Sequence, residues 1–389
     1  MNAFARRGRL APAALVYAQL AHGFSWLLVF WAAWSGNLTN PLYGFAWIHA
    51  VALAWVTMTA LSIFIDALPN LIEVPWRGRR AALLSIVVYG AGVALLIAAF
   101  LGDTAMLAPA ASLLLLALAV YLATAFRTIA SAMRGERIQR AVARAFGGTF
   151  LFLLATAIAG FALPTAHAAL GTLGWLSLLI FGISMRTIRI ITDEVSRFRR
   201  MHIVVGSLSV LGVPILAAGV AAHIAALAWT GGTLFSVAAL GYAFDVLDMV
   251  RRSRNPYRPP QAFIVVAIFW LLASLVLGAG VLSGKPWQQA YMFLLLIGWV
   301  GQMVNAHVYA ANSPDLLETR LSWYSFFAFQ VAIAVLAAGL LSESAGLAAR
   351  GALFGAVGWI AMMANMFAAR TRAKTLAKVG TPNHGSHDW

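Results

Sequence analysis

Twelve long runs of apolar residues, separated by short polar segments, make up most of the chain. Each run is close to the roughly 20 residues that an α-helix needs to cross the hydrocarbon core of a bilayer. We therefore expect an all-α membrane protein with spans at 11–33, 44–69, 81–102, 104–126, 142–163, 165–190, 203–226, 228–250, 261–283, 287–311, 321–342 and 347–369. The connecting segments are too short to fold separately, so we interpret residues 1–379 as a single polytopic domain and residues 380–389 as a short disordered tail.

The basic residues lie in every second segment between the spans. With the N-terminus placed inside, 25 of the 27 Lys and Arg residues fall on the cytoplasmic side, and only Lys285 and Arg350 fall outside. This asymmetry predicts a multi-pass protein of the bacterial inner (plasma) membrane with both termini in the cytoplasm. Because topology accounts for the net charge of +15, we expect anionic lipid headgroups as a partner, and no nucleic acid.

The composition narrows the chemistry that the protein can perform. Hydrophobic residues make up 62% of the chain and charged residues 10%, and there are no cysteines. Disulfides, thiolate metal sites and cysteine nucleophiles are thereby excluded, so a metal site has to use histidine, methionine, tyrosine or carboxylates. The sequence also contains no phosphate-binding glycine loop, Ser-His-Asp set or zinc protease motif. Whether the protein is an enzyme stays open.

A tryptophan recurs in the second, sixth and tenth spans, each time directly after a small residue. Trp55, Trp175 and Trp299 are separated by 120 and 124 residues. Equal spacing of this kind indicates an internal repeat. We expect three blocks of four helices, at roughly 11–126, 142–250 and 261–369. The alternative is that each tryptophan simply packs where the small residue lets a neighbouring helix approach.

Four histidines are expected in the outer half of the membrane. His22 falls near the middle of the first span, whereas His49, His167 and His223 lie within about two turns of the outer ends of theirs. Ionisable side chains at bilayer depth are costly and tend to be functional. Because neutral imidazole is a common ligand of heme iron and copper, we expect the four to bind a cofactor, with His49, His167 and His223 as metal ligands. The alternatives are hydrogen bonds to neighbouring helices or a water-filled pore.

Other polar side chains are weaker candidates. His307 belongs to a polar run in the tenth span, which is either a packed hydrogen-bond network or a substrate site, and Tyr291 occupies the outer end of that span. Asp66 and Asp245 fall at cytoplasmic helix ends, where they either pair with arginines such as Arg77, Arg251 and Arg252 or take up protons. Two histidines of the C-terminal tail, in a segment more typical of a disordered end, could also chelate a metal.

The pattern of helices and histidines resembles a known group of membrane proteins. Twelve helices in three arcs, with His49 at the outer end of the second span and Pro69 20 residues later, are similar to heme-copper oxidase subunit I. The stretches from His49 to Asn70 and from Ala166 to Arg186 resemble helices of the NnrS family, heme- and copper-containing membrane proteins linked to nitric oxide stress. The resemblance implies heme b, copper or both as cofactors, and a role in nitric oxide or respiratory stress.

The sequence also departs from the oxidase pattern. The outer end of the tenth span carries Gln288, Gln289 and Tyr291 where the oxidases have axial histidines, and only one histidine stands in the seventh span. Oxygen reduction is therefore not expected. Position 47, where NnrS-type helices carry a second histidine, is Trp47.

Two other function classes stay open. The histidines could line the pathway of a secondary transporter or channel, in which Asp66 or Asp245 moves protons. The chain could also be a structural subunit, with the chemistry carried by a membrane partner or a second copy of itself.

Overall fold

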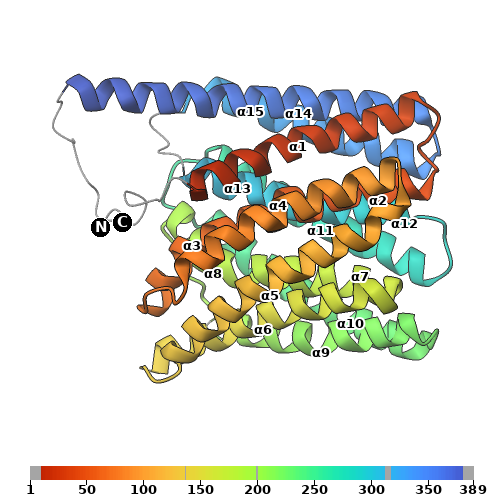
Figure 1. Cartoon of the computed structure of the whole chain (residues 1–389). Coiled ribbons are helices and arrows are strands. Elements are labelled where there is room, and N and C mark those ends of the chain that lie inside the picture. The colour runs from red at the N-terminus through yellow and green to blue at the C-terminus, as the bar shows by residue number, and fades with distance from the viewer. Residues whose placement is uncertain (1–9, 136, 199, 312–316, 380–389) are drawn as a thin grey trace.

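The computed structural model describes residues 10–135, 137–198, 200–311 and 317–379. These residues form a bundle of helices without strands (Figure 1). Twelve segments within them are long and apolar enough to cross a membrane, which confirms the all-α, twelve-span prediction. The tail at 380–389, with its two histidines, lies outside the described residues.

The spans follow one another along the chain in three groups of four. The first group comprises α1 (Leu10–Trp34), α2 (Pro41–His49), η1 (Ala50–Thr57), α3 (Met58–Ile72), α4 (Arg79–Leu101), η2 (Thr104–Met106) and α5 (Leu107–Ala132). The second comprises α6 (Arg137–Ala162), α7 (Pro164–Ala169), η3 (Leu170–Ser177), α8 (Leu178–Thr192), α9 (Met201–Ala221) and α10 (Ala225–Arg251). The third comprises α11 (Pro259–Leu282), α12 (Gln288–Phe293), η4 (Leu294–Gly301), α13 (Gln302–Ala311), α14 (Thr319–Leu341) and α15 (Ala345–Val379). Every predicted span overlaps an observed one, and α15 extends furthest beyond its predicted end because its Ala, Arg, Lys and Leu residues favour helix.

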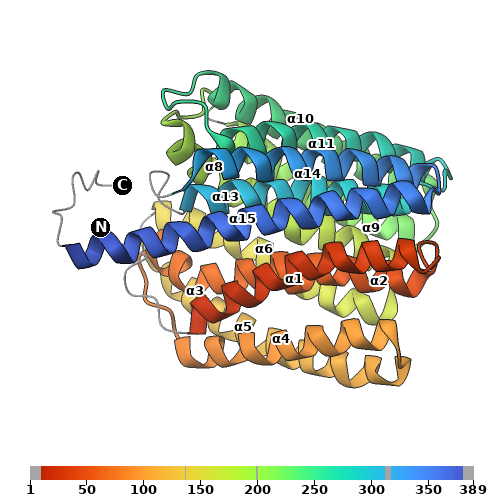
Figure 2. The same ribbon diagram turned by 90° about the horizontal axis from the view of Figure 1, so that it is seen from above.

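Short connections make successive spans antiparallel neighbours. α4 packs on α5, α9 on α10 and α14 on α15. α15 also packs along α1, which brings the two ends of the described chain together and closes the bundle (Figure 2).

The bundle has two ends with different charge. α1 begins and α15 ends at the same end, on the left in Figure 1. We call this end the basic face, because it carries the described arginines Arg77, Arg79, Arg127, Arg134, Arg189, Arg197, Arg252, Arg254 and Arg372. The other end, the opposite face, carries Lys285 and the start of α15. Assignment of the basic face to the cytoplasm stays a prediction.

The three tryptophan-bearing spans are the most buried. In the spans Pro41–Ile72, Pro164–Ser184 and Gln288–Ala310, 67%, 61% and 78% of the residues of the most apolar stretch are buried, against 33–50% in the other nine spans of the described chain. η1, η3 and η4 contact one another in the interior. The second, sixth and tenth spans therefore form the centre of the bundle.

Each central span is interrupted by an eight-residue π-helix: η1, η3 and η4. The tryptophan is the sixth residue of each segment. A π-helix holds more residues per turn than an α-helix and often occurs at functional sites. Sequence periodicity does not reveal these segments, because their composition is that of an ordinary apolar helix.

Indole N–H groups connect the central spans. Trp175 Nε1 donates to Thr57 Oγ1 at 3.0 Å, and Trp299 Nε1 donates to Ser177 Oγ at 3.3 Å. Each acceptor stands two residues after the tryptophan of its own span. The third position of this kind is Gly301, where an added Cβ would lie 2.9 Å from the Trp55 ring, and Trp55 Nε1 has no partner.

The small residues beside the tryptophans allow close packing, as one sequence interpretation held. A Cβ at Gly174 would lie 2.5 Å from the Phe152 ring of α6, and one at Gly298 would lie 2.8 Å from Trp270 of α11. Close packing and internal repetition are compatible, so the three-block organisation stays a prediction.

Candidate metal centre

His49 and His167 form a pair near the opposite face. His49 ends α2, which begins at Pro41 after the Asn40 cap, and His167 lies in α7, which begins at Pro164. Their ring centroids are 6.0 Å apart and the ring planes differ by 16°. The fold thus brings together two imidazoles that are 118 residues apart in the sequence.

Backbone carbonyls hold both rings in the same way. Nδ1 of His49 lies 2.7 Å from the Phe45 carbonyl oxygen, and Nδ1 of His167 lies 2.8 Å from that of Thr156. A carbonyl can only accept, so both Nδ1 atoms carry the proton and both Nε2 atoms keep a lone pair. A histidine that donates from one nitrogen to a carbonyl and binds metal through the other is the usual arrangement in metal sites.

Small and apolar residues surround the pair. The Phe100 ring lies 5.2 Å from the His49 ring. On the other side, a Cβ at Gly160 would be 3.0 Å from His167 Nδ1, so the glycine of α6 allows His167 to approach the carbonyl that anchors it. Both histidine side chains are half-buried.

The geometry suits a metal that needs two protein nitrogens. A metal at about 2.0–2.1 Å from each imidazole holds the two nitrogens about 4 Å apart and their ring centres about 6 Å apart. The observed centroid distance of 6.0 Å matches this spacing. In the described part of the chain, no group of three or more His, Asp or Glu residues is arranged to hold a metal ion. The described residues therefore offer a metal two imidazole ligands, and any further ligand would come from a cofactor or from outside this pair.

His22 does not join this pair. Its ring stacks on Trp55 with a centroid distance of 3.5 Å and an interplanar angle of 4°. The side chain is 1% exposed, and Nδ1 has no hydrogen-bond partner in the protein. The expected cluster of four histidines is thus divided, because α1 turns His22 toward the bundle centre.

His223 lies in an exposed turn directly after α9. Its φ of +56° is a left-handed conformation, and the N–H of Ile224 bonds to the Gly219 carbonyl at 2.8 Å. This geometry is the usual termination of a helix. His223 contacts neither His49 nor His167 among the ring pairs of the described residues.

The two candidate residues of the tenth span, His307 and Tyr291, both contact neighbouring helices. His307 Nδ1 donates to the Met303 carbonyl at 2.6 Å, and its Nε2 accepts from the Thr187 hydroxyl of α8. Both nitrogens are occupied, which agrees with the packed-network interpretation. Tyr291 packs against Gly278 of α11.

The acidic candidates differ from one another. Asp66 pairs with Arg79 at 2.9 Å. Arg79 lies two residues after Arg77, the partner predicted from the sequence. Asp245 is 0% exposed, and one of its oxygens accepts from Ser196 Oγ at 2.6 Å. Among the described residues, no arginine pairs with Asp245 and its other oxygen has no hydrogen-bond partner.

Asp248, one turn after Asp245 on α10, binds Arg252 at 2.9 Å, and Arg252 also pairs with Glu194. The hydrogen bond from Arg252 to Asp248 raises the pKa of this guanidinium. The ion pairs of Arg252 therefore connect the loop after α8 to the end of α10.

Several features of the site were not found from the sequence. They include the carbonyl anchors, Gly160, the π-helices and the stacking of His22 on Trp55. One signal was present: aligning the three tryptophans places Thr57, Ser177 and Gly301 at the same position.

No protein-family model and no curated protein matches the chain. The site itself is therefore the basis for a functional proposal.

Proposed function

We propose that the protein is an integral membrane metalloprotein in which His49 and His167 bind heme b iron or copper. The observation that carries the proposal is the matched pair: two imidazoles 6.0 Å apart, each anchored through Nδ1 to a carbonyl. The anchors set the tautomer and restrict ring rotation, so less conformational freedom is lost when a metal binds. A bound heme or copper would supply one-electron redox chemistry.

The resemblance to the NnrS and heme-copper oxidase group extends this proposal. It connects the pair to nitric oxide or respiratory stress in a bacterial inner membrane, with the basic face toward the cytoplasm. The proposed ligands come from the second and sixth spans, whereas the oxidases' low-spin heme is held by the second and tenth.

Three four-helix repeats are part of the same proposal. Its support is the recurrence of the eight-residue π-helix, the indole-to-hydroxyl bonds and one shared helix end. Glu73 and Asp193 both end their spans with φ 53° and ψ 33°, 18 residues after Trp55 and Trp175. Two unrelated spans would not be expected to end at the same distance from their tryptophans and with the same backbone angles.

The deciding experiment is an absorption spectrum and a metal analysis of the detergent-purified protein. We expect a Soret band with iron, or stoichiometric copper, and loss of most of that metal in His49→Ala and in His167→Ala. His202→Ala is the matched control, because His202 is exposed at the start of α9 near the basic face. A colourless wild-type protein without iron or copper would refute the proposal.

One observation favours the alternative of a secondary transporter or channel. Asp245 is a fully buried carboxylate with one unpartnered oxygen, and such groups in membrane proteins commonly carry protons or ions. If this function is the correct one, proton flux in proteoliposomes would be lost in Asp245→Asn and kept in Asp66→Asn, because Asp66 is already neutralised by Arg79. Equal flux in both variants and in wild type would exclude Asp245 as a carrier.

A further inference from the structure

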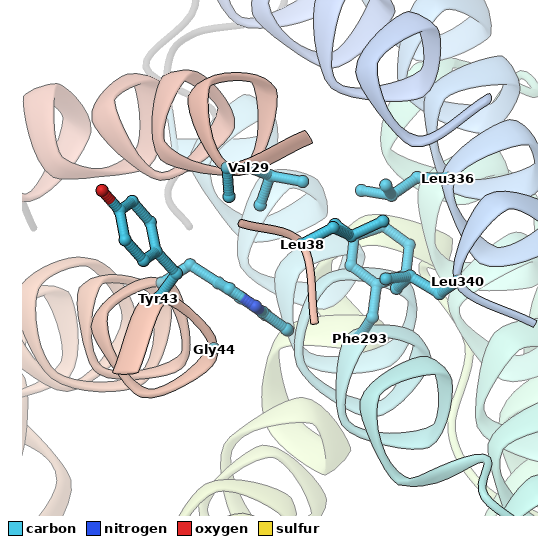
Figure 3. Close-up of a pocket in the computed structure, with 9 residues that line it drawn as sticks. Val29, Leu38, Tyr43, Gly44, Phe293, Leu336 and Leu340 are labelled. Atoms are coloured by element: carbon cyan, nitrogen blue, oxygen red, sulfur yellow. The ribbon is translucent and has the colours of Figure 1, made fainter. Parts of the chain in front are cut away.

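Two hollows in the described part of the chain differ greatly in size. Near the opposite face, a pocket between α1, α2, α12 and α14 is lined by Val29, Leu38, Tyr43, Phe293, Leu336 and Leu340 (Figure 3). Its volume of about 10 Å³ has room for about one water molecule. Between α4 and α5 there is a groove with a volume of about 250 Å³. Of the two, the groove has the room for a larger molecule.

Short side chains keep the groove open. Its lining consists of Ala81, Leu84, Ser85 and Val88 of α4 and Leu116, Ala117 and Val120 of α5. Ser85 and Ala117 are 4% and 2% exposed, whereas Leu84 and Leu116 are 63% and 60% exposed. The two short side chains therefore lie at the bottom, and the two leucines form the walls. Because the Ser85 hydroxyl bonds to the Ala82 carbonyl of its own helix at 2.8 Å, the groove is apolar in character.

The groove opens toward the membrane. α4 forms one edge of the bundle (Figure 2), and the span that contains α5 is among the least buried, at 33%. From Ala81 to Val88 the groove follows about 10 Å of helix, which is about a third of the hydrocarbon core. Since α4 begins at Arg79, the groove occupies the third of the core nearest the basic face.

Each wall of the groove ends in an arginine at the basic face. On α4, Arg80 stands one helical turn before Leu84. On α5, Leu116, Val120 and Arg127 are four and seven residues apart, so they share one stripe of the helix. The apolar walls thus lead directly to two guanidinium groups.

The two arginines lie at the same level of the bundle. The Arg77 N–H donates to Thr128 Oγ1 at 2.9 Å, which brings the start of α4 beside this part of α5. Arg80 follows Arg77 by three residues, and Arg127 directly precedes Thr128. Both arginine side chains are exposed, and neither forms an ion pair within the described part of the chain. They are therefore available to an anionic partner from outside the protein.

We propose that this groove binds one anionic phospholipid, with an acyl chain between α4 and α5 and the phosphate at Arg80 and Arg127. The apolar lining suits an acyl chain, because both surfaces are apolar and pack without loss of hydrogen bonds. Guanidinium groups bind phosphate through paired N–H donors. Arginines at the membrane surface also attract anionic headgroups. The two arginines give the site its preference for anionic over zwitterionic lipid.

A second copy of the chain suits this groove less well. In a symmetric dimer the same patch of both copies meets at the interface. Arg80 and Arg127 of one copy would then lie beside those of the other, and like charges without acidic partners repel. A lipid phosphate instead neutralises the two arginines, so charge favours the lipid.

Native mass spectrometry tests the proposal on protein released from nanodiscs of equal parts phosphatidylglycerol and phosphatidylcholine. We expect one phosphatidylglycerol per chain, retained several-fold more often than phosphatidylcholine. Arg80→Gln combined with Arg127→Gln should abolish this preference. Ala81→Leu, which fills one end of the groove without a change of charge, should reduce retention. Arg200→Gln combined with Arg251→Gln is the charge-matched control, because both arginines are exposed beside α9 and α10.

Three results would overturn the proposal. They are equal retention of the two lipids by the wild-type protein, the same loss of phosphatidylglycerol in the control as in the groove variant, and a lipid-free dimer. Circular dichroism of each variant shows whether it has folded, and Ala81→Leu tests the groove with both arginines in place.

Fluorescence quenching tests the position of the lipid in a bilayer, since the chain has no native cysteine. A bimane label at Leu84→Cys in the groove wall is compared with one at Leu240→Cys, where the leucine is 53% exposed on α10. Bromine atoms on the acyl chains of one lipid at a time quench the label. At position 84 we expect several-fold stronger quenching by brominated phosphatidylglycerol than by brominated phosphatidylcholine, and at position 240 equal quenching by both.

Equal quenching by the two lipids at position 84 would mean that the groove holds bulk lipid, and would contradict the proposal. Absence of quenching by either lipid would mean that protein covers the groove, and would contradict it too. Neither readout depends on a bound metal, so the outcome is separate from that of the metal-site proposal.

Discussion

At the scale of single residues, backbone contacts decide which histidines are available for ligation. His49 and His167 use Nδ1 for carbonyl bonds and keep Nε2 free, whereas His307 uses both nitrogens. His22 instead has an aromatic partner in Trp55. Histidines of similar sequence context thus differ in which ring nitrogen is available, because their neighbours differ.

Gly160 should be required for the geometry of His167. A methyl group there would lie 3.0 Å from His167 Nδ1, so Gly160→Ala should displace the ring and weaken its bond to the Thr156 carbonyl. We expect a shifted Soret band or a reduced copper content, measured by absorption and metal analysis. Gly148→Ala on the same helix is the control, because nothing lies within 4 Å of its Cβ position. Identical spectra in the two variants would show that His167 does not bind the metal.

His223 should be replaceable by glycine. Its φ of +56° is unfavourable for a side chain by about 1–2 kcal/mol, so His223→Gly should raise the thermal unfolding midpoint in detergent. Since His223 lies apart from the pair, metal content should be unchanged. Loss of metal in this variant would make His223 a ligand after all, as the sequence suggested.

At the scale of elements, the three π-helices are held together by side-chain bonds across the centre. Trp175 and Trp299 each donate to a hydroxyl of a neighbouring central span. These bonds connect positions that are far apart in sequence and fix the rotation of each helix about its axis. The histidines at the outer ends of the same spans depend on that rotation.

Removal of one acceptor should therefore destabilise the bundle. Thr57→Val keeps the side-chain shape but leaves Trp175 Nε1 unpaired in the interior, at an expected loss of about 1–3 kcal/mol. Thr59→Val is the control, because the Thr59 hydroxyl donates to the Trp55 carbonyl of its own span. Thermal unfolding in detergent should show a clearly larger decrease for Thr57→Val. A double variant with Trp175→Phe should lose less than the sum of the two single losses, since both remove the same bond.

At the scale of the whole molecule, the described chain combines two features at different depths. The histidine pair lies near the opposite face, between the second and sixth spans, and the stack of His22 on Trp55 lies deeper in the bundle, between the first and second spans. Charge at the two ends of the bundle sets its orientation in the membrane.

The orientation is open to a direct test. In intact cells, an impermeant thiol reagent should modify Ser283→Cys, in the exposed turn after α11, and should not modify Arg254→Cys at the basic face. The reverse labelling pattern would mean that the termini are outside, and that the positive-inside rule fails for this chain.

The sequence by itself determined the helical class, the twelve spans and the predicted sidedness. Apolar length and loop charge are local properties, so they can be counted along the chain. It also singled out His49 and His167 as the first ligand candidates, with His22 and His223 next. Only the tertiary structure decided which histidines meet, because His49 and His167 lie 118 residues apart on separate spans whose packing brings their ring centroids to 6.0 Å. The indole bonds and the Thr156 carbonyl that anchors His167 were decided there too, because each joins residues from separate spans whose rotation no local pattern records.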